Sequence, residues 1–325
     1  MTVRIVRRHW RAALLAGVLL CAACSGAKDK SLLGIRSDAA SLEQTSLEYA
    51  LRGDLPRALA IEEQALLAYR SVDDTASITG ALNRVGNLRQ RTGDKAGARA
   101  AYAEAQSLAA VTGNGAEEAA ARSNLGTLDE EAGDLASADA QYQAARALAQ
   151  SAKANATLAT ILNNQALLAR RQGDPERAIA LLGQALEIDR DAGNEAGVAN
   201  RLRNLGAVQA AAGHRKEAVA SLEEALEIDR KRENVPEIAL DLVTLSEINA
   251  LDPGTLAVAV SQRRRAADIH RLLDREDQVA RDETAIASWC TGLGADATGE
   301  TAAACAAAAA AQAGSAGKGA TATAR

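Results

Sequence analysis

The stretch that decides the fold is residues 119–149, AAARSNLGTLDEEAGDLASADAQYQAARALA. It contains two segments, 119–132 and 136–149, in which apolar residues recur with the period of an α-helix, and Gly133 lies between them. Glycine accepts the positive φ that commonly ends a helix, and the next residue, Asp134, can cap the following helix through its side chain. The stretch therefore predicts a helix, a tight turn and a second helix.

This pattern returns every 40 residues along most of the chain. The turn glycine recurs in register, and aspartate follows it in every copy except the last, where His214 takes its place. The recurring positions are Gly53, Gly93, Gly133, Gly173 and Gly213, with two alanine columns at 58, 98, 138, 178, 218 and at 65, 105, 145, 185, 225. A fixed period of this size indicates one helical unit stacked on copies of itself. Such arrays present extended surfaces that hold partners.

The spacing inside each period resembles that of the tetratricopeptide repeat. Further copies of its Gly/Ala–Ala–large–Ala pattern, and a sixth with one inserted residue, follow the same order. The copies are Ser46/Ala58/Glu62/Ala65, Gly86/Ala98/Tyr102/Ala105, Gly126/Ala138/Tyr142/Ala145, Ala166/Ala178/Leu182/Ala185, Gly206/Ala218/Leu222/Ala225 and Ser246/Ala259/Arg263/Ala266. The 40-residue period and the missing proline are similar to long-period members of that family, such as kinesin light chains and bacterial peptide-sensing regulators. HEAT and armadillo repeats share the length but do not explain the Gly-Asp turn.

The resemblance implies an all-α, right-handed solenoid over residues 38–290, with about six hairpins and a closing helix near 276–289. We expect about thirteen helices and no sheet. Because phenylalanine is absent, the core must consist of Ala, Leu, Ile and Val. Arg263 stands where a large apolar side chain packs in other copies, so the sixth repeat is expected to be partly open. Acid pairs such as Glu62-Glu63 are expected at solvated positions.

Residues 1–23 resemble a bacterial lipoprotein signal peptide. Four arginines precede an apolar stretch, 12–23, that is too short to span a bilayer. Small residues precede Cys24, as in a lipobox, so we expect lipidation (palmitate) of Cys24 and a tether over 24–37. The alternative is ordinary cleavage after Ala27, which would leave a soluble periplasmic protein. Loss of four arginines and no acid would change the formal net charge from −5 to −9, and an acidic body argues against nucleic-acid binding.

The C-terminal region carries the two remaining cysteines, Cys290 and Cys305. In an oxidising compartment an even pair suggests a disulfide; the alternative is two free thiols. Residues 291–325 are rich in alanine and glycine and lack an amphipathic pattern, so they are predicted to be a disordered tail in which 303–313 could form a frayed helix.

No residue pattern points to catalysis. The three histidines have no metal-ligand spacing, and no phosphate-binding loop or nucleophile elbow is present. We therefore expect no enzyme activity, no cofactor, no metal and no small-molecule substrate.

Polar residues instead recur on the first helix of each hairpin. Asn124, Asn164 and Asn204 share one column, which holds Arg84 in the second repeat. By resemblance, first helices line the concave face of the solenoid, and an amide there can pair with any extended main chain. The candidate groove residues are Asn83, Arg84, Asn87, Asn124, Asn163, Asn164, Asn200, Arg203 and Asn204. The alternative is that these amides bond to neighbouring repeats and serve stacking alone.

The sequence thus predicts a non-catalytic protein-interaction scaffold, anchored by lipid to the periplasmic face of a bacterial outer membrane, that binds an extended peptide or a partner protein. Two alternatives remain at this point. One is a soluble periplasmic adaptor, and the other is a self-associating structural subunit of an envelope assembly.

Overall fold

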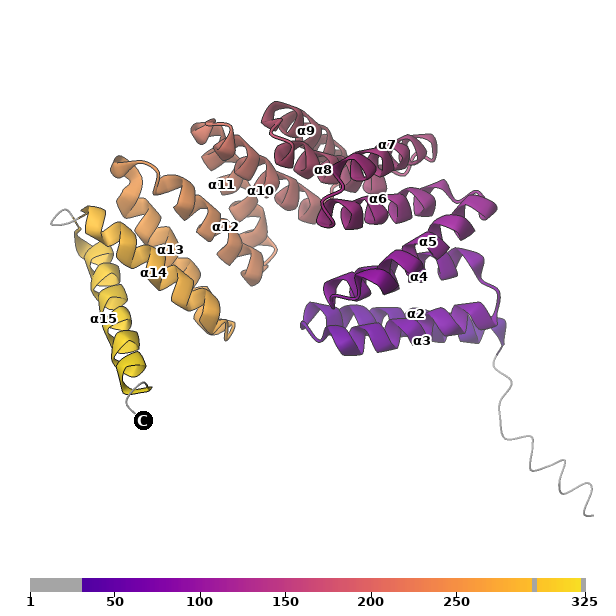
Figure 1. Ribbon diagram of the computed structural model, residues 1–325, viewed down its shortest axis with the longest axis horizontal. Coiled ribbons are helices and arrows are strands. Elements are labelled where there is room, and N and C mark those ends of the chain that lie inside the picture. Colours follow the sequence, from indigo (N-terminus) through magenta and orange to yellow (C-terminus); the bar gives the residue numbers. More distant parts are fainter. Residues whose placement is uncertain (1–30, 294–296, 323–325) are drawn as a thin grey trace, which may run out of the picture. The chain divides into compact units, whose positions relative to one another are not determined.

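A computed structural model describes residues 31–293 and 297–322 of the 325-residue chain. These residues contain fourteen α-helices and one short 3-10 helix, and no strand (Figure 1). The prediction of an all-α array of helical hairpins is confirmed. The predicted signal peptide and Cys24 lie outside the described residues. Among the helices that are described, none combines the length and the apolar character needed to cross a membrane.

The chain divides into two compact units, residues 1–113 and 114–325. Two hairpins form the first unit, α2 with α3 and α4 with α5. Their bounds are α2 Leu32–Leu51, α3 Leu55–Ser71, α4 Thr75–Arg91 and α5 Lys95–Thr112. Helix α2 begins six residues before the predicted start of the solenoid, so residues 32–37 of the expected tether are helical; Ser31 caps this helix through its hydroxyl.

Four further hairpins, a closing helix and a final helix form the second unit. The bounds are α6 Gly115–Glu131, α7 Leu135–Ser151, α8 Asn155–Arg171, α9 Pro175–Asp191, α10 Glu195–Ala211, α11 Arg215–Lys231, α12 Val235–Asn249, α13 Leu256–Leu272, α14 Glu276–Leu293 and α15 Gly299–Ala322. A 3-10 turn, Pro253–Thr255, precedes α13. This turn accommodates the residue inserted in the sixth repeat.

The turn inside each of the first five hairpins has the predicted geometry. Gly133 adopts a φ of 87°, and the carboxylate of Asp134 accepts a hydrogen bond from the backbone N–H of Ser137 at 3.0 Å. The other copies repeat this arrangement, except that His214 makes no side-chain capping bond. The left-handed residue between hairpins is less regular, because Lys153 and Glu233 adopt φ values of 52° and 53° where Gly113 and Gly193 stand in other copies.

A second glycine column explains how closely the paired helices approach. A Cβ atom added to Gly126 would lie 2.8 Å from the ring of Tyr142, and one added to Gly86 would lie 2.3 Å from the ring of Tyr102. The glycine on the first helix therefore makes room for the large residue on the second. Both tyrosine rings are almost fully buried, so the expectation of a core made of Ala, Leu, Ile and Val alone is wrong.

The sixth repeat is closed, which corrects the expectation of an open one. Arg263 of α13 is 7% exposed, and its Nε donates to Asp282 of α14 at 2.7 Å. Its guanidinium also lies 5.8 Å from the centroid of the Trp289 ring. The closing helix thus supplies an acid and an aromatic face for an arginine that has replaced an apolar residue.

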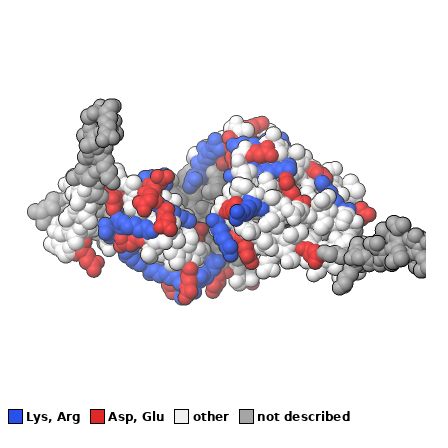
Figure 2. Space-filling model, turned by 90° about the horizontal axis from the view of Figure 1, so that it is seen from below, with Lys and Arg blue, Asp and Glu red and all other residues white. Residues whose placement is uncertain are grey.

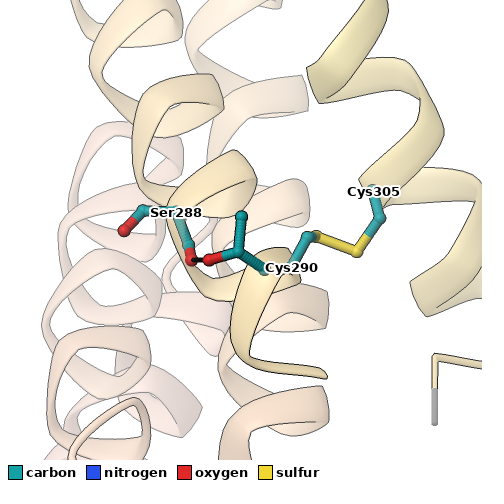
Figure 3. Close-up of a disulfide and its surroundings, with 4 residues drawn as sticks. Ser288, Cys290 and Cys305 are labelled. Carbon is teal, nitrogen blue, oxygen red and sulfur yellow. Dashed lines mark hydrogen bonds between the residues drawn. A yellow bond between two sulfur atoms is a disulfide. The ribbon is translucent and has the colours of Figure 1, made fainter. Parts of the chain in front are cut away.

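The predicted disordered tail is also corrected, because residues 299–322 form α15. Its Ala304 and Ala308 are buried against Val260 of α13 and Ile286 of α14. Cys290 of α14 and Cys305 of α15 point toward each other and are joined as a disulfide, with their Cα atoms 5.6 Å apart (Figure 3). Alanine has a high helix propensity, which favours this helix locally. Apolar residues of α13 and α14 then give it a surface to pack against, although its own sequence has no amphipathic pattern.

Candidate peptide-binding groove

A shallow pocket of about 270 Å³ lies between the first helices α6 and α8 of the second unit. Asn124 of α6 lines it, beside Ser123 and opposite Thr157 and Thr160 of α8. Asn124 is half-buried, and no hydrogen bond to its side chain is found in the described part of the chain. An amide in this position can offer one donor and one acceptor group to a main chain laid along the pocket.

The other predicted asparagines of this unit form a chain of hydrogen bonds across three first helices. Asn164 donates to the hydroxyl of Ser123 at 3.1 Å, and Asn204 donates to Oδ1 of Asn163 at 2.7 Å. Asn163 in turn donates to Oδ1 of its neighbour Asn164 at 3.3 Å, and Asn200 is exposed and accepts from Arg201 at 2.9 Å. This chain connects α6, α8 and α10, so Asn163, Asn164 and Asn204 contribute to the stacking of repeats.

Arg203 lies beneath this surface. It is 9% exposed and forms ion pairs with Asp241 at 2.6 Å, Asp229 at 2.6 Å and Glu237 at 2.9 Å. Burial raises the pKa of Asp241 to about 6, although the bond from Arg203 acts in the opposite direction. Its Oδ2 atom is buried and has no hydrogen-bond partner among the described residues. Arg203 therefore joins α10, α11 and α12 and is not presented to a ligand.

In the first unit the predicted residues also connect helices. Arg84 of α4 forms ion pairs with Glu62 of α3, at 2.7 Å, and with Glu43 of α2. Asn87 accepts a hydrogen bond from the hydroxyl of Tyr102 at 2.6 Å, and Asn83 is 6% exposed. The side chain of Glu62 is 1% exposed, so the expectation that it is solvated is wrong. Burial raises its pKa to about 7, whereas a side-chain hydrogen bond with Ser46 acts in the opposite direction.

Sequence reasoning missed the acids that pair with the buried arginines. Asp189 and Asp229 occupy the same position of successive repeats, 40 residues apart, and each pairs with an arginine of the next first helix, Arg201 or Arg203. The 40-residue register could have found this aspartate column. No group of His, Cys, Asp and Glu residues suited to hold a metal is found within the described ranges.

Acidic and basic side chains are interspersed on the face drawn in Figure 2. This matches the many ion pairs between neighbouring helices, such as that of Arg190 with Glu224 at 2.6 Å. Exposed pairs of this kind contribute little to stability individually.

Comparison with protein families places a tetratricopeptide repeat match at residues 157–231, which run from α8 to the end of α11. The comparison with curated proteins gave no match.

Solved structures of similar fold cover more of the chain. BtubC (BKLC) from P. vanneervenii is 23% identical, with a TM-score of 0.50, over 62% of this chain and 83% of its own. The Rap protein complexed with competence and sporulation factor is 12% identical, with a TM-score of 0.57, over 78% of this chain and 74% of its own. The APC/C hetero-tetramer Cut9-Hcn1 is 19% identical, with a TM-score of 0.56, over 79% of this chain and 46% of its own.

At these identities the similarity concerns the fold alone, and it agrees with the hairpin geometry and the glycine and alanine columns described above. The chain has a tetratricopeptide-type helical-hairpin fold, and its residues 157–231 match the tetratricopeptide repeat family itself.

Proposed function

We propose that this protein is a non-catalytic interaction scaffold that binds an extended polypeptide along α6, α8 and α10. The observation that carries the proposal is Asn124, whose amide lines the pocket between α6 and α8 without a hydrogen bond in the described structure. The exposed Asn200 lies on α10, which is the first helix of the hairpin that follows α8 and α9. The fold supports this role, and the Rap protein with a similar fold was solved in complex with competence and sporulation factor.

We further propose that the scaffold is attached by lipid at Cys24 to the periplasmic face of the outer membrane. Support comes from the arginine-rich start, the short apolar stretch and the small residues before Cys24. Several acyl chains together give stable attachment where one does not. A soluble periplasmic adaptor is the alternative that ordinary signal cleavage would produce.

Site-specific photocrosslinking in intact cells tests the groove. A photoreactive residue is placed at Thr160, an exposed residue of the pocket, or at Ala147, an exposed residue of the second helix α7. We expect crosslinks to one polypeptide from position 160 and not from 147, and we expect the double variant Asn124→Ala/Asn200→Ala to abolish them. Equal crosslinking from both positions, or crosslinks indifferent to the double variant, would contradict the proposal.

Metabolic labelling with a palmitate analogue tests the anchor. The unaltered chain should carry label and sediment with membranes, and Cys24→Ala should lose both properties. Cys290→Ala serves as a control, because that cysteine belongs to the disulfide with Cys305. A soluble, unlabelled mature protein would favour the periplasmic adaptor instead.

A further inference from the structure

A second pocket, of about 420 Å³, lies between α12, α13 and α14 of the second unit. Helix α12 contributes Leu240 and Val243, and α13 contributes His270. The start of α14 contributes Arg275, just before its first residue, and Arg281 in its second turn. The residues of the α6–α8 pocket do not line this one, so the two are separate sites.

The polar floor of this pocket is held in place by buried groups. His270 is 6% exposed, and its Nδ1 lies 2.6 Å from Oδ2 of Asp282. Asp282 is 2% exposed and accepts a second hydrogen bond from Nε of Arg263 at 2.7 Å. Because Nδ1 of His270 is hydrogen-bonded to Asp282, Nε2 is the ring nitrogen that remains for a ligand in the pocket. No hydrogen bond to it is found among the described residues.

The charges of the lining are unevenly paired. Each acid already has an arginine partner, Glu237 with Arg203 at 2.9 Å, and Glu247 and Asp282 with Arg263 at 3.0 and 2.7 Å. Arg275 and Arg281 are exposed, and within residues 31–293 and 297–322 neither side chain has an ion-pair partner. Gln278 lies between them in the sequence, and all three residues line the pocket.

The opposite wall is apolar. Leu240 is 45% exposed, and Val243 and Pro236 line the pocket beside it. An exposed aliphatic surface beside two unpaired guanidinium groups matches a ligand that combines an aliphatic side chain with a carboxylate. Arginine is well suited to carboxylates because its donors form a planar fork.

We propose that the α12–α14 pocket binds a polypeptide segment in which an acidic residue adjoins an aliphatic one. The carboxylate pairs with Arg275 and Arg281, and the aliphatic side chain packs on Leu240 and Val243. This inference rests on the proposed function in one respect, that the ligand is a polypeptide, and it names a site and a ligand chemistry different from the asparagine groove.

Fluorescence anisotropy with the purified full chain tests this proposal. The probe is a labelled decapeptide of alternating leucine and glutamate, and its matched control carries glutamine at each glutamate. We expect the acidic peptide to bind at least tenfold more tightly than the glutamine peptide. Arg275→Gln/Arg281→Gln should remove this difference, whereas Arg265→Gln, an exposed arginine of α13 outside the pocket, should preserve it.

A second variant examines the apolar wall. Leu240→Ser should weaken the binding of both peptides by a similar factor. The preference for the glutamate peptide should remain, because the arginines are unchanged. Circular dichroism of each variant establishes that it is folded, as expected for substitutions of exposed side chains.

Three results would overturn the proposal. They are equal binding of the two peptides, an equal loss of binding in Arg265→Gln, and full competition by inorganic phosphate where sodium chloride of the same ionic strength does not compete. The last result would identify a simple anion site. The double variant Asn124→Ala/Asn200→Ala separates this proposal from the groove, since it should abolish the crosslinks in cells without changing binding of the acidic peptide.

Discussion

At the scale of single residues, buried polar groups define how neighbouring repeats meet. Small apolar side chains fit one another in many registers, whereas a buried amide or carboxylate needs its partner at one place. Asn204 with Asn163, and Arg203 with Asp241, are such pairs between repeats. The asparagine column recognised in the sequence therefore has two roles here, with Asn124 facing a pocket and Asn163 and Asn204 bonded to each other.

The Asn204–Asn163 bond makes a first prediction. Asn204→Ala would leave the buried Oδ1 of Asn163 without its 2.7 Å donor, and an unsatisfied buried acceptor costs about 1–3 kcal/mol. Asn124→Ala should change the free energy of unfolding by less than about 0.5 kcal/mol, because no hydrogen bond is lost in the described structure. Urea unfolding of both variants measures this. Equal effects would show that the chain of asparagine hydrogen bonds across α6, α8 and α10 does not stabilise stacking.

A second prediction concerns pH. Burial raises the pKa of Asp241 to about 6 in the folded state, above the ordinary value of 3.8. The folded protein therefore binds this proton more readily than the unfolded chain does, and the group's stabilising contribution is present below pH 3.8 and is lost as the pH rises through about 6. The full effect is roughly 3 kcal/mol for about two pKa units.

Asp241→Asn should remove that contribution to the pH dependence. Denaturant unfolding at pH 4.0 and 6.5 gives the difference for the unaltered chain and for the variant, and the variant should show a smaller fall in stability toward pH 6.5. Asp191→Asn, an exposed acid at the end of α9, is the control and should behave like the unaltered chain. An unchanged difference in Asp241→Asn would disprove the assignment.

At the scale of elements, the turns inside the first five hairpins follow from chemistry visible in the sequence. The turn glycine takes a positive φ and the aspartate after it caps the next helix, as the spacing predicts. Among the helices that follow the turn glycine, the exception is α11, where His214 stands at the cap and bonds to no backbone N–H. Helices α8, α12 and α13 also begin without a side-chain capping bond. Helices α11 and α15 are the elements where a substitution has a clear expected effect.

His214→Asp should stabilise the protein. The carboxylate can accept from the N–H of Glu217, as Asp134 does from Ser137, and a capping residue in place of a non-capping one contributes about 1 kcal/mol. Thermal unfolding should show a higher Tm for His214→Asp and little change for His214→Ala. A lower Tm in the aspartate variant would mean that the histidine makes a contribution other than capping.

The final helix makes a different prediction, since few side chains hold it. Ala304 and Ala308 are its buried residues among those whose side chains are described, and the disulfide fixes it to α14. In the chain-entropy view, closing the loop between Cys290 and Cys305 contributes about 3 kcal/mol to stability. Cys290→Ser/Cys305→Ser should therefore increase amide exchange in α15 at least tenfold and leave exchange in α8 to α11 unchanged. Unchanged exchange in α15 would show that alanine packing alone holds the helix.

At the scale of the whole molecule, stability is distributed over contacts between neighbouring hairpins. In the second unit one core cluster joins Leu222 and Leu226 of α11 to Leu242 and Leu245 of α12. No hairpin completes its core alone, so the loss of one hairpin exposes the apolar face of the next.

Truncation measures this dependence. A chain that ends at Lys231 should expose Leu222 and Leu226, and since burial of a leucine contributes about 1.5–3 kcal/mol, it should unfold at clearly lower urea concentration or aggregate. A chain that ends at Leu293 loses α15 alone and should keep most of its stability. Similar midpoints for the two truncated chains would contradict a stability built from neighbouring repeats.

The sequence by itself determined the repeat length, the helix–turn–helix unit, the capping residues and the six hairpins with a closing helix, because these follow from local backbone chemistry and a fixed period. Only the tertiary structure decided the partners of the polar residues. The buried Arg203 pairs with Asp229, 26 residues along the chain, and the buried Arg263 pairs with Asp282, 19 residues along the chain. Helix α15 likewise depends on the surface that α13 and α14 offer it. The repeat period determines which residues face the neighbouring repeat. The packing of that repeat in three dimensions determines which atoms they contact.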